Sequence, residues 1–125
     1  METAITIISA VLMVFFLFAS SIKILGWQKK IFALQLQFFE SYGLNRELMF
    51  AVGVIELLGA SLIMLQHNLL GVVGAAAIAA TSLGAIGFHL KFDSWKDAIP
   101  AMLTLTLSIF LLATNATLHM ALNAL

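Results

Sequence analysis

The chain has 125 residues, which allows one domain, and 62% of them are hydrophobic while only 10% are charged. Soluble domains carry about a quarter charged residues, so this composition, with a mean hydropathy of +1.09, excludes an ordinary soluble globule. A formal charge of zero provides no basic field for nucleic acid, and the absence of cysteine excludes disulfides, thiol catalysis and Cys-ligated metal centres.

Most charged residues fall into two clusters, and the stretches outside them are apolar. Six charges lie between Lys23 and Glu47 and four between Lys91 and Asp97. A helix crosses a hydrocarbon core of about 30 Å with about 20 apolar residues. The chain is therefore predicted to be all-α, an integral membrane four-transmembrane-helix bundle forming a single transmembrane domain over 1–125. Its four predicted spans are 3–25, 48–66, 69–90 and 98–119.

The first window, 3–25, is predicted to be a retained helix, because its apolar run is too long for a signal peptide and no Lys or Arg precedes it.

The connection between the first and second windows has an amphipathic pattern of its own. Apolar residues recur there at helical spacing, and polar residues lie between them, which predicts a short interfacial amphipathic helix over 29–42. The apolar positions are Ile31, Leu34, Phe38 and Tyr42, and the polar ones are Gln35, Gln37, Glu40 and Ser41.

The later windows follow one another through short connections. Little more than Gln66, His67 and Asn68 separates the second window from the third, which predicts a tight antiparallel hairpin. The third window is rich in glycine and alanine, a composition typical of a close helix-packing surface. It is joined to the fourth window by a second short connection over 91–97, so these two helices are also expected to be neighbours.

All six Lys and Arg residues belong to the two connections that an even number of crossings places on one side of the membrane. By the positive-inside rule this side is cytoplasmic, and both termini face outward. We therefore expect an integral membrane protein of a bacterial inner (plasma) membrane. The six residues are Lys23, Lys29, Lys30, Arg46, Lys91 and Lys96.

Glu56 is the one charge isolated in apolar sequence. If its helix begins at Glu47, it lies about 13 Å deep, near the bilayer midplane. An ionisable group there costs about 2.5 to 3.5 kcal/mol and should face the bundle, so ligand or proton binding is the default hypothesis. A glutamate that only fixes helix packing is the alternative. The small neighbours Gly53 and Gly59 suit either use, since they admit a helix or leave space for a ligand.

Lys23 lies near the end of the first window, with Ser20 and Phe16 one and two turns deeper on its face. One interpretation is a lysine that extends toward the interface. The other is an ion pair with Glu56. The two backbones are expected to differ by about 10 Å in depth, so contact requires Lys23 to reach inward.

His89 ends the third window on the same side, with Ser82 on its own face. It could relay a proton or hydrogen-bond a polar ligand head, or simply bind interfacial water. His67 and His119 lie toward the opposite end, and no histidine pair has metal-ligand spacing. We therefore expect no metal.

Four short motifs lie along the chain, namely Ser20-Ser21-Ile22-Lys23-Ile24 followed by Gly26, Gly53-Val54-Ile55-Glu56-Leu57-Leu58-Gly59-Ala60, Gly84-Ala85-Ile86-Gly87-Phe88-His89 and Ala98-Ile99-Pro100-Ala101. Together they resemble the DoxX-like family of small four-helix membrane proteins. One departure is Ser20, where the family pattern commonly has glycine before the lysine. The resemblance implies that Lys23, Glu56 and His89 share one polar pocket opening toward the cytoplasmic leaflet. Some family relatives are subunits of a thiosulfate:quinone oxidoreductase, others belong to membrane redox or oxidative-stress complexes, and distant ones resemble receptor-assembly chaperones.

The leading hypothesis is an accessory subunit of a membrane redox system that binds a quinone or another apolar ligand. Its expected ligand- or proton-binding residues are Glu56, Lys23, His89 and Ser20, and its pocket-lining residues are Phe16, Gly53, Gly59 and Ser82. A proton-coupled transporter acting as a homodimer and a membrane-protein assembly factor are the alternatives. Enzyme status stays open, and the expected partners are the lipid bilayer with either a redox partner subunit or a second copy of the chain.

Overall fold

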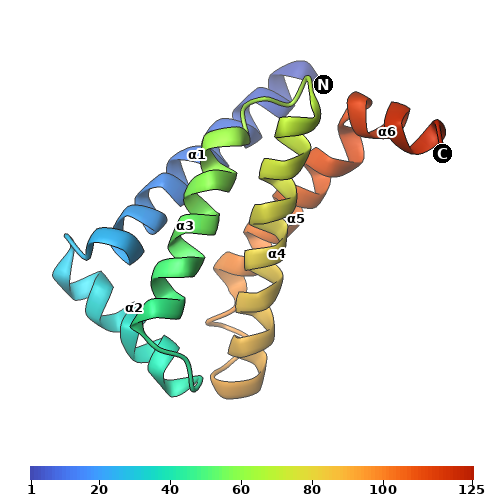
Figure 1. Cartoon of the computed structure of the whole chain (residues 1–125). Helices are drawn as coiled ribbons and strands as arrows, with labels where there is room; N and C mark the ends of the chain where they lie inside the picture. Colours follow the sequence, from blue (N-terminus) through green and yellow to red (C-terminus); the bar gives the residue numbers. More distant parts are fainter.

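The structure, a computed structural model, describes residues 1–125 and contains helices and no strands, which confirms the all-α prediction. The first three helices in Figure 1 occupy the blue to green part of the chain, and the other three the yellow to red part. Their bounds are α1 Glu2–Leu25, α2 Lys29–Ser41, α3 Arg46–Leu62, α4 Leu69–Phe92, α5 Ile99–Thr114 and α6 Ala116–Asn123.

Polar side chains and one glycine set the helix ends. α1 stops at Gly26, whose φ of 67° is left-handed and whose N–H donates to the Ile22 carbonyl. The Gln28 side chain caps the start of α2 by accepting hydrogen bonds from two backbone N–H groups. Asn45 and Asn68 cap α3 and α4 in the same manner. These caps satisfy backbone donors that helix starts leave free.

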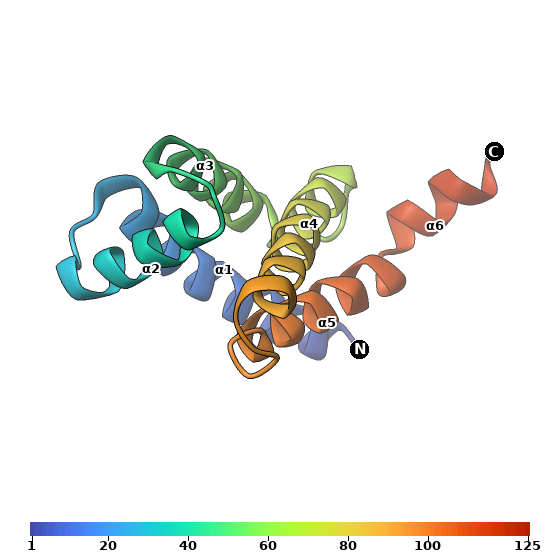
Figure 2. The same ribbon diagram turned by 90° about the horizontal axis from the view of Figure 1, so that it is seen from below.

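α1, α3, α4 and α5 form an up-and-down arrangement in which α3 packs on both α1 and α4, and α4 packs on α5. α2 lies across one end of α1 and α3 (Figures 1 and 2). The two connections that contain lysine, 26–45 and 93–98, lie at this same end, and the turn over 63–68 lies at the opposite end. We call the first end the basic end.

The apolar core fills the half of the bundle away from the basic end. It consists of residues from all four long helices and the turn after α3, among them Leu12, Ile63, Ile78 and Leu111. α3 and α4 approach closely here, since a Cβ at Gly59 would lie 2.9 Å from Ile78 Cγ1 and 3.2 Å from a backbone oxygen of α4. The basic half lacks such a core and holds the polar residues described below.

Two helices, α1 and α4, are long and apolar enough to cross a membrane. α5 and α6 meet the same standard together as one pair bent by 58°. The prediction of one continuous fourth helix over 98–119 is therefore wrong. The break is at Asn115, whose side chain accepts a hydrogen bond from Leu118 N–H and donates to the Gln66 carbonyl. Because Asn115 caps α6 and binds the turn that follows α3, α5 ends there and does not continue into α6 as one straight helix.

Candidate functional site

Lys23 and Glu56 form a buried ion pair in the basic half. Lys23 Nζ lies 3.0 Å from Glu56 Oε1, and the two side chains are 10% and 7% exposed. No hydroxyl, amide or backbone N–H donates a hydrogen bond to Glu56 Oε1, so Lys23 is its partner. Two charges that are this well shielded depend on each other, because water does not replace a lost partner.

Gly53 explains how the two charges meet. A Cβ at Gly53 would lie 2.9 Å from Lys23 Cβ, so the lysine is level with Gly53 in the contact between α1 and α3. Glu56 is three residues further along α3, a rise of about 4.5 Å. The expected depth difference of about 10 Å is therefore wrong, and the lysine stem spans the remaining distance.

Two neighbouring cavities share the ion pair as part of their walls. The larger has a volume of about 440 Å³ and the smaller about 280 Å³. The first lies within the size range of small-molecule sites. The residues that line both are Lys23, Gln35, Phe38, Glu56, Thr81, Ala85 and His89. The larger cavity adds Phe39, Tyr42, Leu44, Val52, Ile55, Ala80, Gly84 and Phe88.

The structure separates the remaining predicted site residues into two groups. Phe16 and Ser82 line the smaller cavity, where the Ser82 and Thr104 hydroxyl oxygens lie 2.7 Å apart. Ser20, Gly53 and Gly59 line neither cavity. The Ser20 hydroxyl donates to the Leu17 carbonyl of its own helix, and both glycines serve helix packing.

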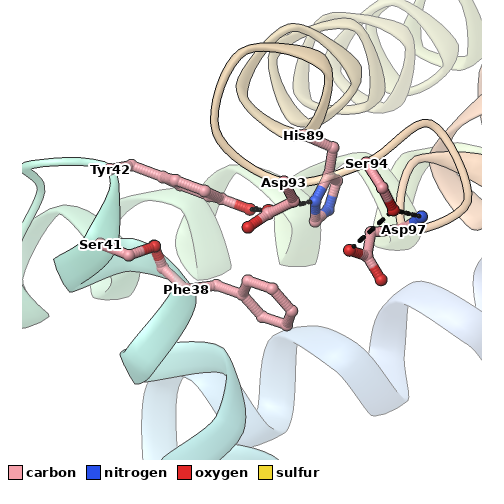
Figure 3. Close-up of polar contacts among 7 residues, drawn as sticks. All are labelled: Phe38, Ser41, Tyr42, His89, Asp93, Ser94 and Asp97. Carbon is pink, nitrogen blue, oxygen red and sulfur yellow. Dashed lines mark hydrogen bonds and ion pairs between the residues drawn. The ribbon is translucent and has the colours of Figure 1, made fainter.

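His89 lies in a hydrogen-bonded cluster with a tyrosine and a carboxylate. Its Nδ1 is 2.9 Å from Asp93 Oδ2 and 3.0 Å from the Tyr42 hydroxyl oxygen. The Tyr42 hydroxyl donates to the same Asp93 oxygen. Figure 3 shows Tyr42 reaching from α2 and His89 from α4, with Asp93 between them. The Tyr42 and Phe88 rings also stack at 5.1 Å, which holds α2 against α4.

Relative to their usual values, the pKa of Tyr42 is raised and the pKa of Asp93 is lowered. Burial raises the pKa of the Tyr42 phenol well above 10, and the hydrogen bond to Asp93 and its negative charge raise it further. The hydrogen bond from Tyr42 lowers the pKa of Asp93, and His89 contributes in the same direction. The cluster therefore favours a neutral phenol beside an ionised carboxylate.

Sequence reasoning missed Tyr42, Asp93 and Gln35 as members of this site. The four-residue spacing of His89 and Asp93 was a usable signal for two side chains on one helix face. Tyr42 gave no such signal, since it is 47 residues away from His89. Gln35 was identified only as a polar position of the amphipathic helix, and in the structure it lines both cavities, with its Oε1 buried and without a hydrogen-bond partner.

One group of side chains could ligate a cation together. Ligand atoms of His89, Asp93 and Asp97 lie within 4.8 Å of one another. Asp93 already accepts hydrogen bonds from His89 and Tyr42, and the Ser94 hydroxyl donates to Asp97 (Figure 3). These hydrogen bonds account for the cluster without a metal, so we assign none.

A family model described as the DoxX-like family matches residues 7–111, and the chain belongs to this family. The match confirms the resemblance described above. Together with the apolar α1 and α4, it identifies a membrane protein. No curated protein and no solved structure matches the chain.

Proposed function

We propose that this DoxX-like protein binds an apolar ligand with a polar head, of the quinone class, in the two cavities of its basic half. The observation that supports this most directly is the Lys23–Glu56 ion pair, which forms part of both cavity walls. An ion pair that served only helix packing would be expected inside a filled helix contact and not beside two cavities. Apolar walls with a few convergent polar groups are typical of small-molecule sites.

The residues present fit such a ligand. Phe38, Phe39, Val52 and Phe88 supply apolar and aromatic surface around the larger cavity. Gln35 adds a polar amide side chain to the walls of both cavities. Lys23, Gln35 and His89 would hold the head.

A bound quinone supplies electron-transfer chemistry, which this cysteine-free chain would use as an accessory subunit beside a redox partner. The chain's own contribution is to bind and orient the ligand head. Its apolar walls also keep water away from that head.

Equilibrium binding of a decyl-substituted benzoquinone to the purified protein in mild detergent tests the proposal. Wild type is expected to bind the probe, and Glu56→Gln to bind it at least about tenfold more weakly, because the Lys23 ammonium then loses the carboxylate that holds it in the cavity wall. Glu40→Gln is the matched control, since Glu40 is exposed on α2 and lines neither of these cavities. Equal binding by all three proteins, or no binding by wild type, would overturn the proposal.

The proposal includes four membrane crossings, by α1, α3, α4 and the bent pair of α5 and α6, with the basic end in the cytoplasm of a bacterium. The clustering of all six Lys and Arg at that end supports this orientation. Because the chain has no cysteine, single exposed reporters can be introduced. In intact cells a membrane-impermeant maleimide is expected to label His67→Cys and to spare Ser94→Cys. The reverse pattern would overturn the orientation.

A further inference from the structure

We infer that a ligand of these cavities is held in one orientation, with its apolar tail in the larger cavity. The tail leaves the bundle sideways between α3 and α4, where Ala80 and Gly84 set the width of the opening. The inference rests on the proposed function and adds the path of the tail and the residues that select for it. It uses no property of the ligand head, so it applies to any amphiphile of the bilayer with one apolar chain.

α3 and α4 are in contact near the turn that joins them and diverge toward the basic end (Figures 1 and 2). A Cβ at Gly74 would lie 2.9 Å from the Gly59 carbonyl oxygen, so the two backbones touch there. About three turns further along α4, a Cβ at Gly84 would have no neighbour within 4 Å. The larger cavity lies between the two helices where they have separated.

The larger cavity opens through the side of the bundle at this divergence. Its lining includes Ile55 of α3 with Ala80 and Gly84 of α4, and all three residues are exposed. They lie near the middle of their helices, so the opening faces sideways and not toward the end of the bundle. In the proposed membrane orientation this side borders lipid chains, from which an apolar ligand can enter without passing through water.

The two cavities differ in the side chains that they do not share. Those of the smaller cavity include three polar ones, Ser82, Asp97 and Thr104. Among those of the larger cavity only Tyr42 is polar, and its hydroxyl is already bonded within the protein. An apolar tail beside the carboxylate and the hydroxyls would cost free energy, because it would remove water from them. The tail is therefore expected in the larger cavity, with the head at the ion pair between the two.

Ala80 and Gly84 keep the side opening wide. They are about one turn apart on α4, and neither has a side chain larger than a methyl group. Leucine at either position would place a branched side chain in the path of the tail. Gly87 provides the contrast, since it is also exposed on α4 with no neighbour within 4 Å of an added Cβ but lines neither cavity.

Equilibrium binding of two probes with the same ring tests the inference, one a decyl-substituted benzoquinone and the other a benzoquinone with methyl substituents only. Gly84→Leu and Ala80→Leu should each weaken binding of the decyl probe by about tenfold and of the methyl probe by less than about twofold. Gly87→Leu is the matched control and should change neither affinity. Ala101→Leu, which narrows the smaller cavity, should not weaken the decyl probe more than the methyl probe.

A second measurement locates the tail directly in wild type. A decyl probe with a diazirine midway along its tail is irradiated in the complex, and mass spectrometry of peptides identifies the modified segments. Modification is expected on α3 and α4 around Ile55 and Gly84. Modification mainly on α1 and α5, around Phe15 and Ala101, would place the tail in the smaller cavity and overturn the inference.

The outcomes separate the inference from the proposed function. Unchanged affinity of Gly84→Leu and Ala80→Leu for the decyl probe, or an equal loss in Gly87→Leu, would overturn the inference while leaving the proposed function intact. An equal loss for both probes in Gly84→Leu would also overturn it, because the effect would not concern the tail. Binding of neither probe by wild type would overturn the proposed function and the inference together.

Discussion

Lys23 of α1 and Glu56 of α3 meet at 3.0 Å in a buried contact that depends on the glycine at position 53. The absence of a side chain at Gly53 lets the lysine Cβ approach α3, and the stem then follows the helix for about one turn to the carboxylate. Helix packing and the candidate ligand site therefore rest on the same contact.

Removing one charge of this pair should destabilise the fold more than removing both. Lys23→Met leaves the Glu56 carboxylate buried alone and is expected to cost about 3 to 5 kcal/mol. The double variant Lys23→Met with Glu56→Gln should recover more than half of that loss, because neither remaining group is charged. Unfolding in detergent measures both values.

Lys91→Met is the control for this series, since Lys91 is exposed and forms no ion pair. A double variant as unstable as the sum of its single variants would show that Lys23 and Glu56 are not energetically coupled.

Gly53→Ala should push α1 and α3 apart. The added Cβ would lie 2.9 Å from Lys23 Cβ and 3.0 Å from Ile24 Cγ1, and the first of these atoms cannot rotate away. A loss of about 1 to 3 kcal/mol in thermal unfolding is expected. Gly87→Ala is the matched control on α4, where no atom lies within 4 Å of the new Cβ, so it should be neutral or slightly stabilising. Equal effects of the two substitutions would contradict this packing.

Tyr42 should ionise only at a pH well above 10, and its titration can be followed alone because it is the single tyrosine of the chain. Phenolate absorbance during an alkaline titration gives its pKa. Asp93→Asn should lower that pKa toward 10 without reaching it, since burial, the larger cause, remains. An unchanged pKa in Asp93→Asn would contradict the Tyr42–Asp93 hydrogen bond.

The contact between Tyr42 and Asp93 also predicts how stability depends on pH. The pKa of Tyr42 is raised in the folded state, so its contribution is complete below about pH 10 and is lost as the pH rises through the folded pKa. The pKa of Asp93 is lowered, so its contribution is present above about pH 4 and is lost as the pH falls through the folded pKa. Thermal unfolding of Tyr42→Phe should lack the alkaline loss.

Asn115 should hold the bend between α5 and α6. Its side chain caps α6 through Leu118 N–H at 2.9 Å and donates to the Gln66 carbonyl at 2.9 Å. Asn115→Ala removes both bonds and is expected to cost about 1 to 2 kcal/mol in thermal unfolding. Asn115→Asp keeps the cap acceptor and should lose less. Asn123→Ala, at the exposed end of α6, serves as control, and an equal loss there would contradict the role of Asn115.

The sequence indicated Glu56 as a site residue because a lone charge in an apolar run is visible without a structure. It did not reveal Asp93, because the predicted helix ended at residue 90, whereas α4 continues to Phe92 and brings Asp93 beside His89. Tyr42 could not be found, because its contact with Asp93 depends on how α2 folds back across the bundle. The direction of Gln35 depends on the rotation of α2 about its own axis, which its packing against α1 and α3 sets.

The central claim is that the cavities beside Lys23 and Glu56 bind an apolar ligand, and native mass spectrometry of protein extracted from its own membrane tests it most directly. Wild type and Glu40→Gln are expected to retain a small molecule of quinone type, and Glu56→Gln to lose it. The same bound mass in Glu56→Gln, or an empty wild-type protein, would contradict the claim.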